Sequence, residues 1–229
     1  MSRETLVSHS TPAELVLAGH RGDVATLRRA LASSVPHHRL LALGGLSKLA
    51  ALTPTETETA SRDTDRGVRH RLAQIGARDV RVGIHGLLTL LADSDFAVAE
   101  TAAWALGERF EGRAAVDLDP AVLDALCDNA SNHPHPMVRE SCVAALGAIG
   151  DDRGLPAILA GCRDKPAVRR RAILALAPFD GDEVDAALQA ALSDRDWQVR
   201  QAAEDLLGIA GSDSNDEADS DSVTGVANP

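Results

Sequence analysis

The sequence predicts an all-α fold, a right-handed α-solenoid of about six stacked helical hairpins. Only five of the 229 residues are aromatic and none is Tyr, while Ala and Leu are abundant, and this composition favours short, closely packed helices over a β-sandwich or barrel. A short apolar pattern also returns at intervals of 30, 31 or 40 residues, which is typical of stacked repeats. Because one short hairpin cannot bury its own apolar face, neighbouring hairpins must share a continuous core.

Residues 1–78 carry a degenerate form of the pattern, with helices expected at four places. If helices simply alternate, the first pairs with the second and the third with the fourth. A competing register matches Pro36 and Arg39 to Pro166 and Arg169 of a clear repeat, and this match exchanges the roles of the helices there. The sequence leaves both registers open. The expected helices are 13–19, 23–33, 36–52 and roughly 62–76.

A polar stretch rich in Thr and Glu, residues 53–64, separates the last two of these helices. Its composition predicts an inserted polar loop. Gly44 and Gly45 lie inside a helical pattern and not after a strand. They therefore indicate a close contact between helices and not a phosphate-binding loop.

Four regular repeats follow in residues 79–210 and continue the N-terminal part as one domain. Each places apolar residues four apart after a turn containing Asp or Pro, and three of the four end in a glycine suited to a helix C-terminus. A second apolar helix lies between copies, and an insertion at Phe110–Asp119 accounts for the 40-residue interval. The copies are Val98, Ala102, Leu106 and Gly107; Val138, Cys142, Leu146 and Gly147; Val168, Ala172, Leu176 and Ala177; and Val199, Ala203, Leu207 and Gly208.

The repeated pattern Asp-x-x-x-x-Val-Arg, followed by Ala-Leu-Gly, resembles HEAT repeats of the phycobilisome-lyase HEAT-like group. The resemblance is closest from Pro136 to Asp151 and extends over roughly residues 80–210. In HEAT repeats the Arg pairs with an Asp of the inter-helix turn or of the next repeat. The resemblance therefore implies a structural ladder, which Ala99 interrupts in one copy. The ladder residues are Arg69, Arg139, Arg169 and Arg200.

The charge balance limits the classes of partner. The formal net charge of −11 is partly concentrated in residues 211–229, which are predicted to be a disordered acidic tail. The body of the chain is not basic, so binding to nucleic acid by phosphate neutralisation is disfavoured. No stretch approaches the roughly 20 apolar residues that span a bilayer, and no apolar signal segment is evident. A cytoplasmic monomer without a membrane partner is expected.

Cysteine and histidine give no reason to expect a metal, a cofactor or a catalytic residue. Cys127, Cys142 and Cys162 lack the C-x-x-C spacing of zinc and redox sites, and Cys142 takes the small position of the core stripe. The close histidine pairs lack a ligand partner at metal-site spacing. These pairs are His37 with His38 and His133 with His135.

The opposite face of the second helices is predicted to line the inner, concave surface of the solenoid. With 100° per residue, the second and sixth positions after each Val point away from the apolar stripe. Trp104 is the strongest candidate for binding, with gap filling against the next hairpin as the alternative, whereas Trp197 is expected to pack against the previous repeat. The predicted binding face consists of His70, Gln74, Glu100, Trp104, Glu140, Ala144, Arg170, Leu174, Gln201 and Asp205.

These observations favour a non-catalytic scaffold or adaptor that binds a protein partner on its concave face. One alternative is a nucleic-acid-binding solenoid resembling HEAT-like DNA glycosylases, because Trp104 and Glu108 lie four apart on one helix. That alternative requires a continuous stripe of arginines. Another is a bilin-lyase-like or other HEAT-like enzyme accessory subunit. The HEAT-like di-iron hydroxylases carry His-Glu dipeptides, and this chain has none. The arginine stripe that the nucleic-acid-binding alternative requires would comprise Arg69, Arg71, Arg139, Arg169, Arg170 and Arg171.

Overall fold

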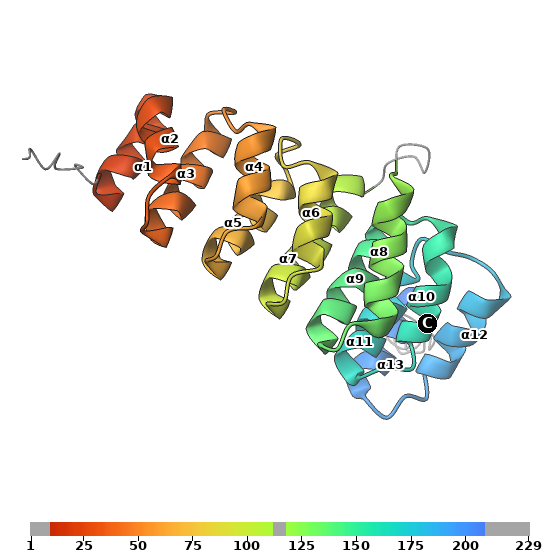
Figure 1. Ribbon diagram of the computed structural model, residues 1–229. Coiled ribbons are helices and arrows are strands. Elements are labelled where there is room, and N and C mark those ends of the chain that lie inside the picture. The colour runs from red at the N-terminus through yellow and green to blue at the C-terminus, as the bar shows by residue number, and fades with distance from the viewer. Residues whose placement is uncertain (1–9, 112–117, 209–229) are drawn as a thin grey trace, which may run out of the picture.

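The computed structural model describes residues 10–111 and 118–208, so the predicted acidic tail and most of the insertion at 110–119 lie outside the described residues. Within those two ranges the regular elements are thirteen α-helices and one short 3-10 helix, with no strand, and the predicted all-α solenoid is confirmed (Figure 1). The helices are α1 (Pro12–Arg21), α2 (Val24–Leu31), α3 (Pro36–Lys48), α4 (Pro54–Ser61), α5 (Arg66–Gly76), α6 (Ile84–Leu91), α7 (Phe96–Phe110), α8 (Pro120–Asn132), α9 (Pro136–Ile149), α10 (Leu155–Gly161), α11 (Pro166–Ala175), α12 (Asp182–Ala191) and α13 (Trp197–Leu207), with η2 (Asp152–Gly154) before α10.

The helices form six hairpins, from α2–α3 to α12–α13, preceded by α1. The pairing of 13–19 with 23–33 and of 36–52 with 62–76 is wrong, because α1 packs mainly on α3 and α3 pairs with α2. The competing register is the one that the structure shows. Pro36 is the first residue of α3 as Pro166 is of α11, and Arg39 follows it by three residues as Arg169 follows Pro166.

The predicted loop at 53–64 is also wrong, since most of it is the helix α4. Thr53 caps the helix, its side chain accepting from the backbone N–H of Glu56, while the Glu56 carboxylate accepts from the backbone N–H of Thr53. This reciprocal pair satisfies two N–H groups that a helix start otherwise leaves unpaired. Small side chains, Thr57 and Ser61 among them, face inward and are buried. The segment therefore supplies the first helix of the second hairpin.

One continuous core runs the length of the molecule, from Ala18 to Ala203. The second helices pack closely on one another along the whole row, whereas the first helices α4, α6 and α8 meet at only a few residues. Figure 1 shows these two rows as adjacent layers. Because closer spacing shortens a row of helices, we assign the row of second helices to the inner side of the solenoid. We call the surface of α1, α3, α5, α7, α9, α11 and α13 the inner face. None of the helices in the described ranges is long and apolar enough to cross a membrane.

Ion pairs between arginine and aspartate connect successive hairpins. Each arginine lies near the start of a second helix, binds the aspartate before the next second helix, and donates to a backbone carbonyl of its own turn. Such bidentate, charge-assisted pairs are stronger than neutral hydrogen bonds. The four pairs are Arg39 with Asp63 at 2.6 Å, Arg69 with Asp93 at 2.5 Å, Arg139 with Asp164 at 2.6 Å and Arg169 with Asp194 at 2.7 Å.

The row of ion pairs has a gap at the junction of α7 and α9. Ala99 stands at the arginine position and His133 at the aspartate position. The rings of Phe96 and His135 stack there instead, with centroids 3.9 Å apart. At the C-terminal end, Arg200 donates to the carbonyl oxygen of Asp194 at 2.8 Å. Arg39 was missing from the predicted ladder because it depended on the register that the sequence left open.

Acid should weaken this row of ion pairs. Hydrogen bonds from Arg139 hold the pKa of Asp164 below its usual value, and those from Arg169 do the same for Asp194. Because the folded-state pKa values lie below the unfolded value of about 3.9, the stability they contribute is complete above that value and is lost as the pH falls through the folded-state pKa. We expect the free energy of unfolding, measured with urea and circular dichroism, to fall between about pH 4 and pH 2.

The Asp164→Asn variant isolates one of these ion pairs. It should unfold about 1–2 kcal/mol more easily at pH 7, and its stability should change less than that of the wild type below about pH 4. Asp124→Asn, which alters an exposed carboxylate of α8, is the control. Equal acid dependence in all three proteins would contradict a contribution from the Asp164 pair.

Candidate functional site

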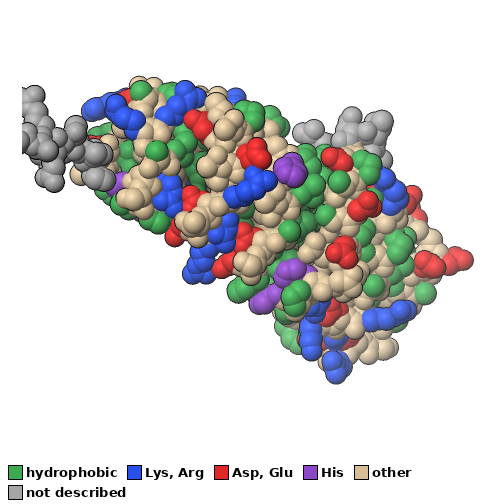
Figure 2. Space-filling view, in the orientation of Figure 1, with side chains coloured by type: hydrophobic (Ala, Val, Ile, Leu, Met, Phe, Trp, Pro, Cys, Tyr) green, Lys and Arg blue, Asp and Glu red, His purple; other side chains and the backbone are tan. Residues whose placement is uncertain are grey.

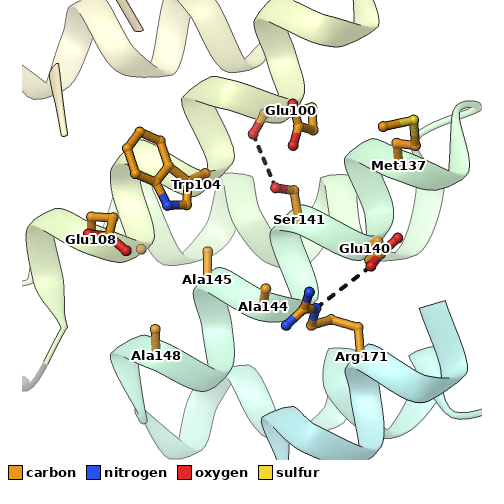
Figure 3. A pocket seen from close by; sticks show the side chains of 11 residues that line it. Glu100, Trp104, Glu108, Met137, Glu140, Ser141, Ala144, Ala145, Ala148 and Arg171 are labelled. Carbon is orange, nitrogen blue, oxygen red and sulfur yellow. Dashed lines mark hydrogen bonds and ion pairs between the residues drawn. The ribbon is translucent and has the colours of Figure 1, made fainter. Parts of the chain in front are cut away.

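A groove of about 410 Å³ lies on the inner face where α7, α9 and α11 meet (Figure 3). Its floor is made of small side chains, Ala144, Ala145 and Ala148 of α9, beside which the indole of Trp104 stands. The Trp104 side chain is not absorbed into the core, since 40% of its surface is exposed. We call this the central groove.

Carboxylates surround the exposed indole. Glu100 and Glu108 lie one helical turn on either side of Trp104, because residues four apart share a helical face. Neither forms an ion pair within the described part of the chain. Glu140 of α9 lies 3.7 Å from Nε of Arg171, and that Nε is buried without a hydrogen-bond partner. The groove therefore presents an aromatic surface with unneutralised negative charge.

The junction beneath the groove is held by uncharged contacts. The hydroxyl of Ser141 donates to the carbonyl oxygen of Glu100 at 3.2 Å, linking α9 to α7. Met137, exposed at the start of α9, forms one end of the groove. The groove thus lies at the junction of α7 and α9, where Ala99 and His133 replace the arginine and the aspartate. The other junctions between hairpins in the described residues 36–208 keep the ion pair.

The structure brings together part of the predicted binding face in this groove. Glu100, Trp104, Glu140 and Ala144 all line it. Further lining residues were not part of the predicted binding face, although Glu108 and Arg171 were singled out for the nucleic-acid-binding alternative. They are Met137 before the Val, Ser141 and Arg171 three residues after it, and Glu108 and Ala148 ten residues after it.

A second groove, of about 440 Å³, lies on the inner face of α1, α3 and α5. We call this the N-terminal groove. Two predicted residues, His70 and Gln74, line it together with His20, Lys48 and Arg71. Nζ of Lys48 lies 3.1 Å from Nδ1 of His20, and Nη1 of Arg71 donates to Oε1 of Gln74 at 3.2 Å.

The remaining predicted residues lie outside both grooves. Arg170 and Leu174 are on α11, and Gln201 donates to Asp205 at 2.9 Å along α13. The expectation that Trp197 packs against the previous repeat is wrong, since this side chain is 64% exposed at the start of α13.

The arginine stripe that a nucleic-acid-binding solenoid requires does not form. Three of its six members, Arg69, Arg139 and Arg169, are neutralised by aspartates in the pairs that connect the hairpins. Arg171 faces Glu140, and Arg71 lies in the other groove. Free guanidinium groups on one face are needed to neutralise successive phosphates.

The three thiols are poorly suited to nucleophilic chemistry. Burial raises the pKa of Cys142, which is completely buried in the core as predicted, and it raises the pKa of Cys162 to about 11. Burial also raises the pKa of Cys127. The thiolate is the reactive form of cysteine. These side chains therefore remain protonated near neutral pH.

Comparison with known proteins agrees with this architecture. Residues 84–167 match the family of HEAT repeats. The match covers α6 to α10, including the α7 and α9 residues that line the central groove, and it identifies HEAT repeats in general and not the narrower phycobilisome-lyase group. No curated protein sequence matches the chain.

Solved structures with a similar fold include designed armadillo repeat proteins. One, in complex with the peptide (KR)4, is 16% identical with a TM-score of 0.56. A second, computationally designed for modular peptide recognition, is 14% identical with a TM-score of 0.53. In both comparisons 87% of this chain and 99% of the other chain are covered. At these identities the similarity shows a shared repeat-solenoid fold.

Proposed function

We propose that this HEAT-like solenoid is a non-catalytic scaffold that binds an extended segment of a protein partner along its inner face. In this proposal a Lys or Arg side chain of the segment lies in the central groove. Its aliphatic stem covers the alanine floor, and its cationic end contacts the indole of Trp104 and the carboxylates of Glu100 and Glu108.

The observation that carries the proposal is the exposed indole between Glu100 and Glu108, two carboxylates that form no ion pair within the described part of the chain. A cation over an indole face is attracted by the ring, by about 0.5–2 kcal/mol depending on desolvation. Lys and Arg bury their stems on apolar surface while keeping the charged group outside. Exposed tryptophans in pockets commonly dominate binding energy. A basic side chain therefore matches the shape and the charge of the central groove together.

The designed armadillo protein that is similar in fold was solved with a peptide of alternating Lys and Arg. That complex supports the general arrangement, a basic peptide bound to a repeat solenoid. The central groove supports the same class of ligand independently, because its exposed indole lies between the carboxylates of Glu100 and Glu108.

A peptide of alternating Lys and Arg is the direct probe. We expect it to bind the full chain, measured by fluorescence anisotropy of a labelled peptide, and an equal-length peptide of alternating Glu and Ser to bind far more weakly. Trp104→Ala should weaken binding by about 10- to 30-fold. The double variant Glu100→Gln with Glu108→Gln should weaken it less and reduce its dependence on salt.

Trp197→Ala is the matched control, because it removes another exposed tryptophan that lies outside both grooves. Circular dichroism and melting temperature should be the same for both Trp variants. Equal affinity of the Trp104→Ala and Trp197→Ala proteins would overturn the proposed binding mode. Failure of the basic peptide to bind the wild-type chain would overturn the ligand class.

A further inference from the structure

Positive and negative charge are separated along the chain. Residues 10–81 contain eleven Lys or Arg and seven Asp or Glu, whereas residues 82–208 contain eleven and twenty-one. On the face seen in Figure 2, Lys and Arg gather over the N-terminal helices, whereas the C-terminal end shows Asp and Glu over α12 together with further Lys and Arg below them. The two grooves of the inner face follow the same separation.

The N-terminal groove combines cations with a hollow apolar floor. No carboxylate lines it, and among the described residues Lys48 and Arg71 form no ion pair. A Cβ atom at Gly44 would lie 3.1 Å from Nη2 of Arg71. The absence of a side chain there lets the guanidinium lie against α3, while Val16 and Leu41 supply apolar surface.

This arrangement fits a carboxylate. The guanidinium of Arg71 can bind two carboxylate oxygens at once, and the ammonium group of Lys48 adds a second positive charge on the neighbouring second helix. Neither cation has to break an internal ion pair to bind an anion. The energetic cost of engaging a ligand is therefore smaller than for Arg39 or Arg69, which are bound to aspartates.

We infer that the segment bound by this protein is bipolar, with an Asp or Glu side chain in the N-terminal groove and a Lys or Arg side chain in the central groove. This inference rests on the proposed function of the central groove. It adds a second contact of opposite charge, and it specifies which charged end of the segment lies in which groove.

The geometry also sets the spacing of the two charges. The cations of the N-terminal groove, Lys48 and Arg71, lie on α3 and α5, and the central groove lies between α7 and α9, so two helix-to-helix steps separate them. Neighbouring packed helices lie 8–10 Å apart, which places the two charge-binding positions about 16–20 Å apart. An extended chain rises about 3.3 Å per residue, so the acidic and basic side chains should be about six residues apart.

Labelled peptides of equal length and a constant Ser and Gly background would test this inference on the full chain. One peptide carries only a basic pair. Two others carry in addition an acidic pair about six residues away, on the N-terminal or the C-terminal side. A fourth has the acidic pair two residues from the basic pair. We expect one of the two six-residue peptides to bind about tenfold more tightly than the basic peptide, and the short-spaced peptide to lose that gain.

The double variant Lys48→Ala with Arg71→Ala should abolish the tenfold gain and leave the affinity of the basic-only peptide unchanged. Arg29→Ala, on the exposed side of α2, is the control and should change neither value. If the basic peptide binds but no bipolar peptide binds more tightly, or the gain survives in the double variant, the inference is overturned and the proposed function stands. If no peptide binds, both are overturned.

The acidic tail of this same chain is the competing occupant. Its acidic residues can be neutralised together by amide substitution in the full chain. If the gain for a bipolar peptide appears only in that variant, the tail and not the partner occupies the N-terminal groove, and the inference is overturned. The residues to change are Asp213, Asp216, Glu217, Asp219 and Asp221.

Discussion

Replacing Arg109 by Leu should lower the free energy of unfolding by about 3–5 kcal/mol, because it removes a buried donor from several carbonyl groups. Arg109 lies near the end of α7 with only 8% of its surface exposed. Its guanidinium donates to the carbonyl oxygens of Gly76, Asp79 and Val82. These groups lie at the end of α5 and in the connection to α6, so one side chain joins two hairpins.

Urea denaturation followed by circular dichroism would measure this loss. Arg163→Leu is the matched control, since Arg163 is exposed after α10, and its stability should stay within about 0.5 kcal/mol of the wild type. Arg109→Lys should fall between the two, because an ammonium group can reach fewer of the carbonyls than a guanidinium. If Arg109→Leu is as stable as Arg163→Leu, the carbonyl groups are satisfied in another way.

The regular part of the fold could be predicted because its repeats carry strong apolar residues at a fixed spacing. The same method failed at α4, which has no apolar stripe. Its buried positions hold Thr57, Ala60 and Ser61, whose small size suits a close contact but gives no hydrophobic signal. The helix start was nevertheless written in the sequence, as Thr53, Pro54 and Glu56 in capping order. The polar composition of residues 53–64 predicted a loop, whereas the capping residues indicated a helix.

The pairing of the first helices failed for a different reason. Simple alternation assumes that the chain starts with the first helix of a hairpin, whereas α1 stands in the row of second helices. The decisive signal was Arg39, which aligns with Arg169 and binds the aspartate before α5 in the same way that Arg169 binds the one before α13. A charged position was more informative here than apolar periodicity.

The inner face was predicted as a stripe that is too narrow. Positions two and six after the Val identified Trp104 and His70, because they lie opposite the apolar stripe. Positions three and ten lie within about 100° of them on a helical wheel, and these hold Arg71 and Glu108. The N-terminal groove also depends on Gly44, whose effect is to leave space for another side chain. Such a gap has no signature in a hydrophobic pattern.

The glycines at the end of the repeat pattern also have a structural role that apolar spacing does not reveal. Gly208 ends α13 with φ of 70°, as a C-terminal glycine should. Gly107 and Gly147 do not end their helices, because α7 continues to Phe110 and α9 to Ile149. A Cβ atom at Gly147 would lie 2.7 Å from Cα of Ala175. The expectation of a C-terminal role is therefore wrong at these two positions.

Gly147→Ala should consequently lower the free energy of unfolding by about 1–3 kcal/mol, because α9 and α11 must move apart to admit one methyl group. Gly86→Ala should have the opposite sign. A Cβ atom at Gly86 in α6 would meet only the Val82 side chain at 3.8 Å, so alanine there should stabilise the helix by about 0.5–1 kcal/mol.

Thermal unfolding would resolve the two changes, since about 1 kcal/mol moves the melting temperature of a chain of this size by about 2–4 °C. The signs of the two shifts in melting temperature separate the two properties of glycine, its low helix propensity and its lack of a side chain at a close helix contact. If both substitutions raise the melting temperature, α9 and α11 can move apart at little cost, and the main effect of Gly147 is that glycine favours a helix less than alanine does. If Gly147→Ala alone lowers it, the spacing between hairpins is set by the absence of that one side chain.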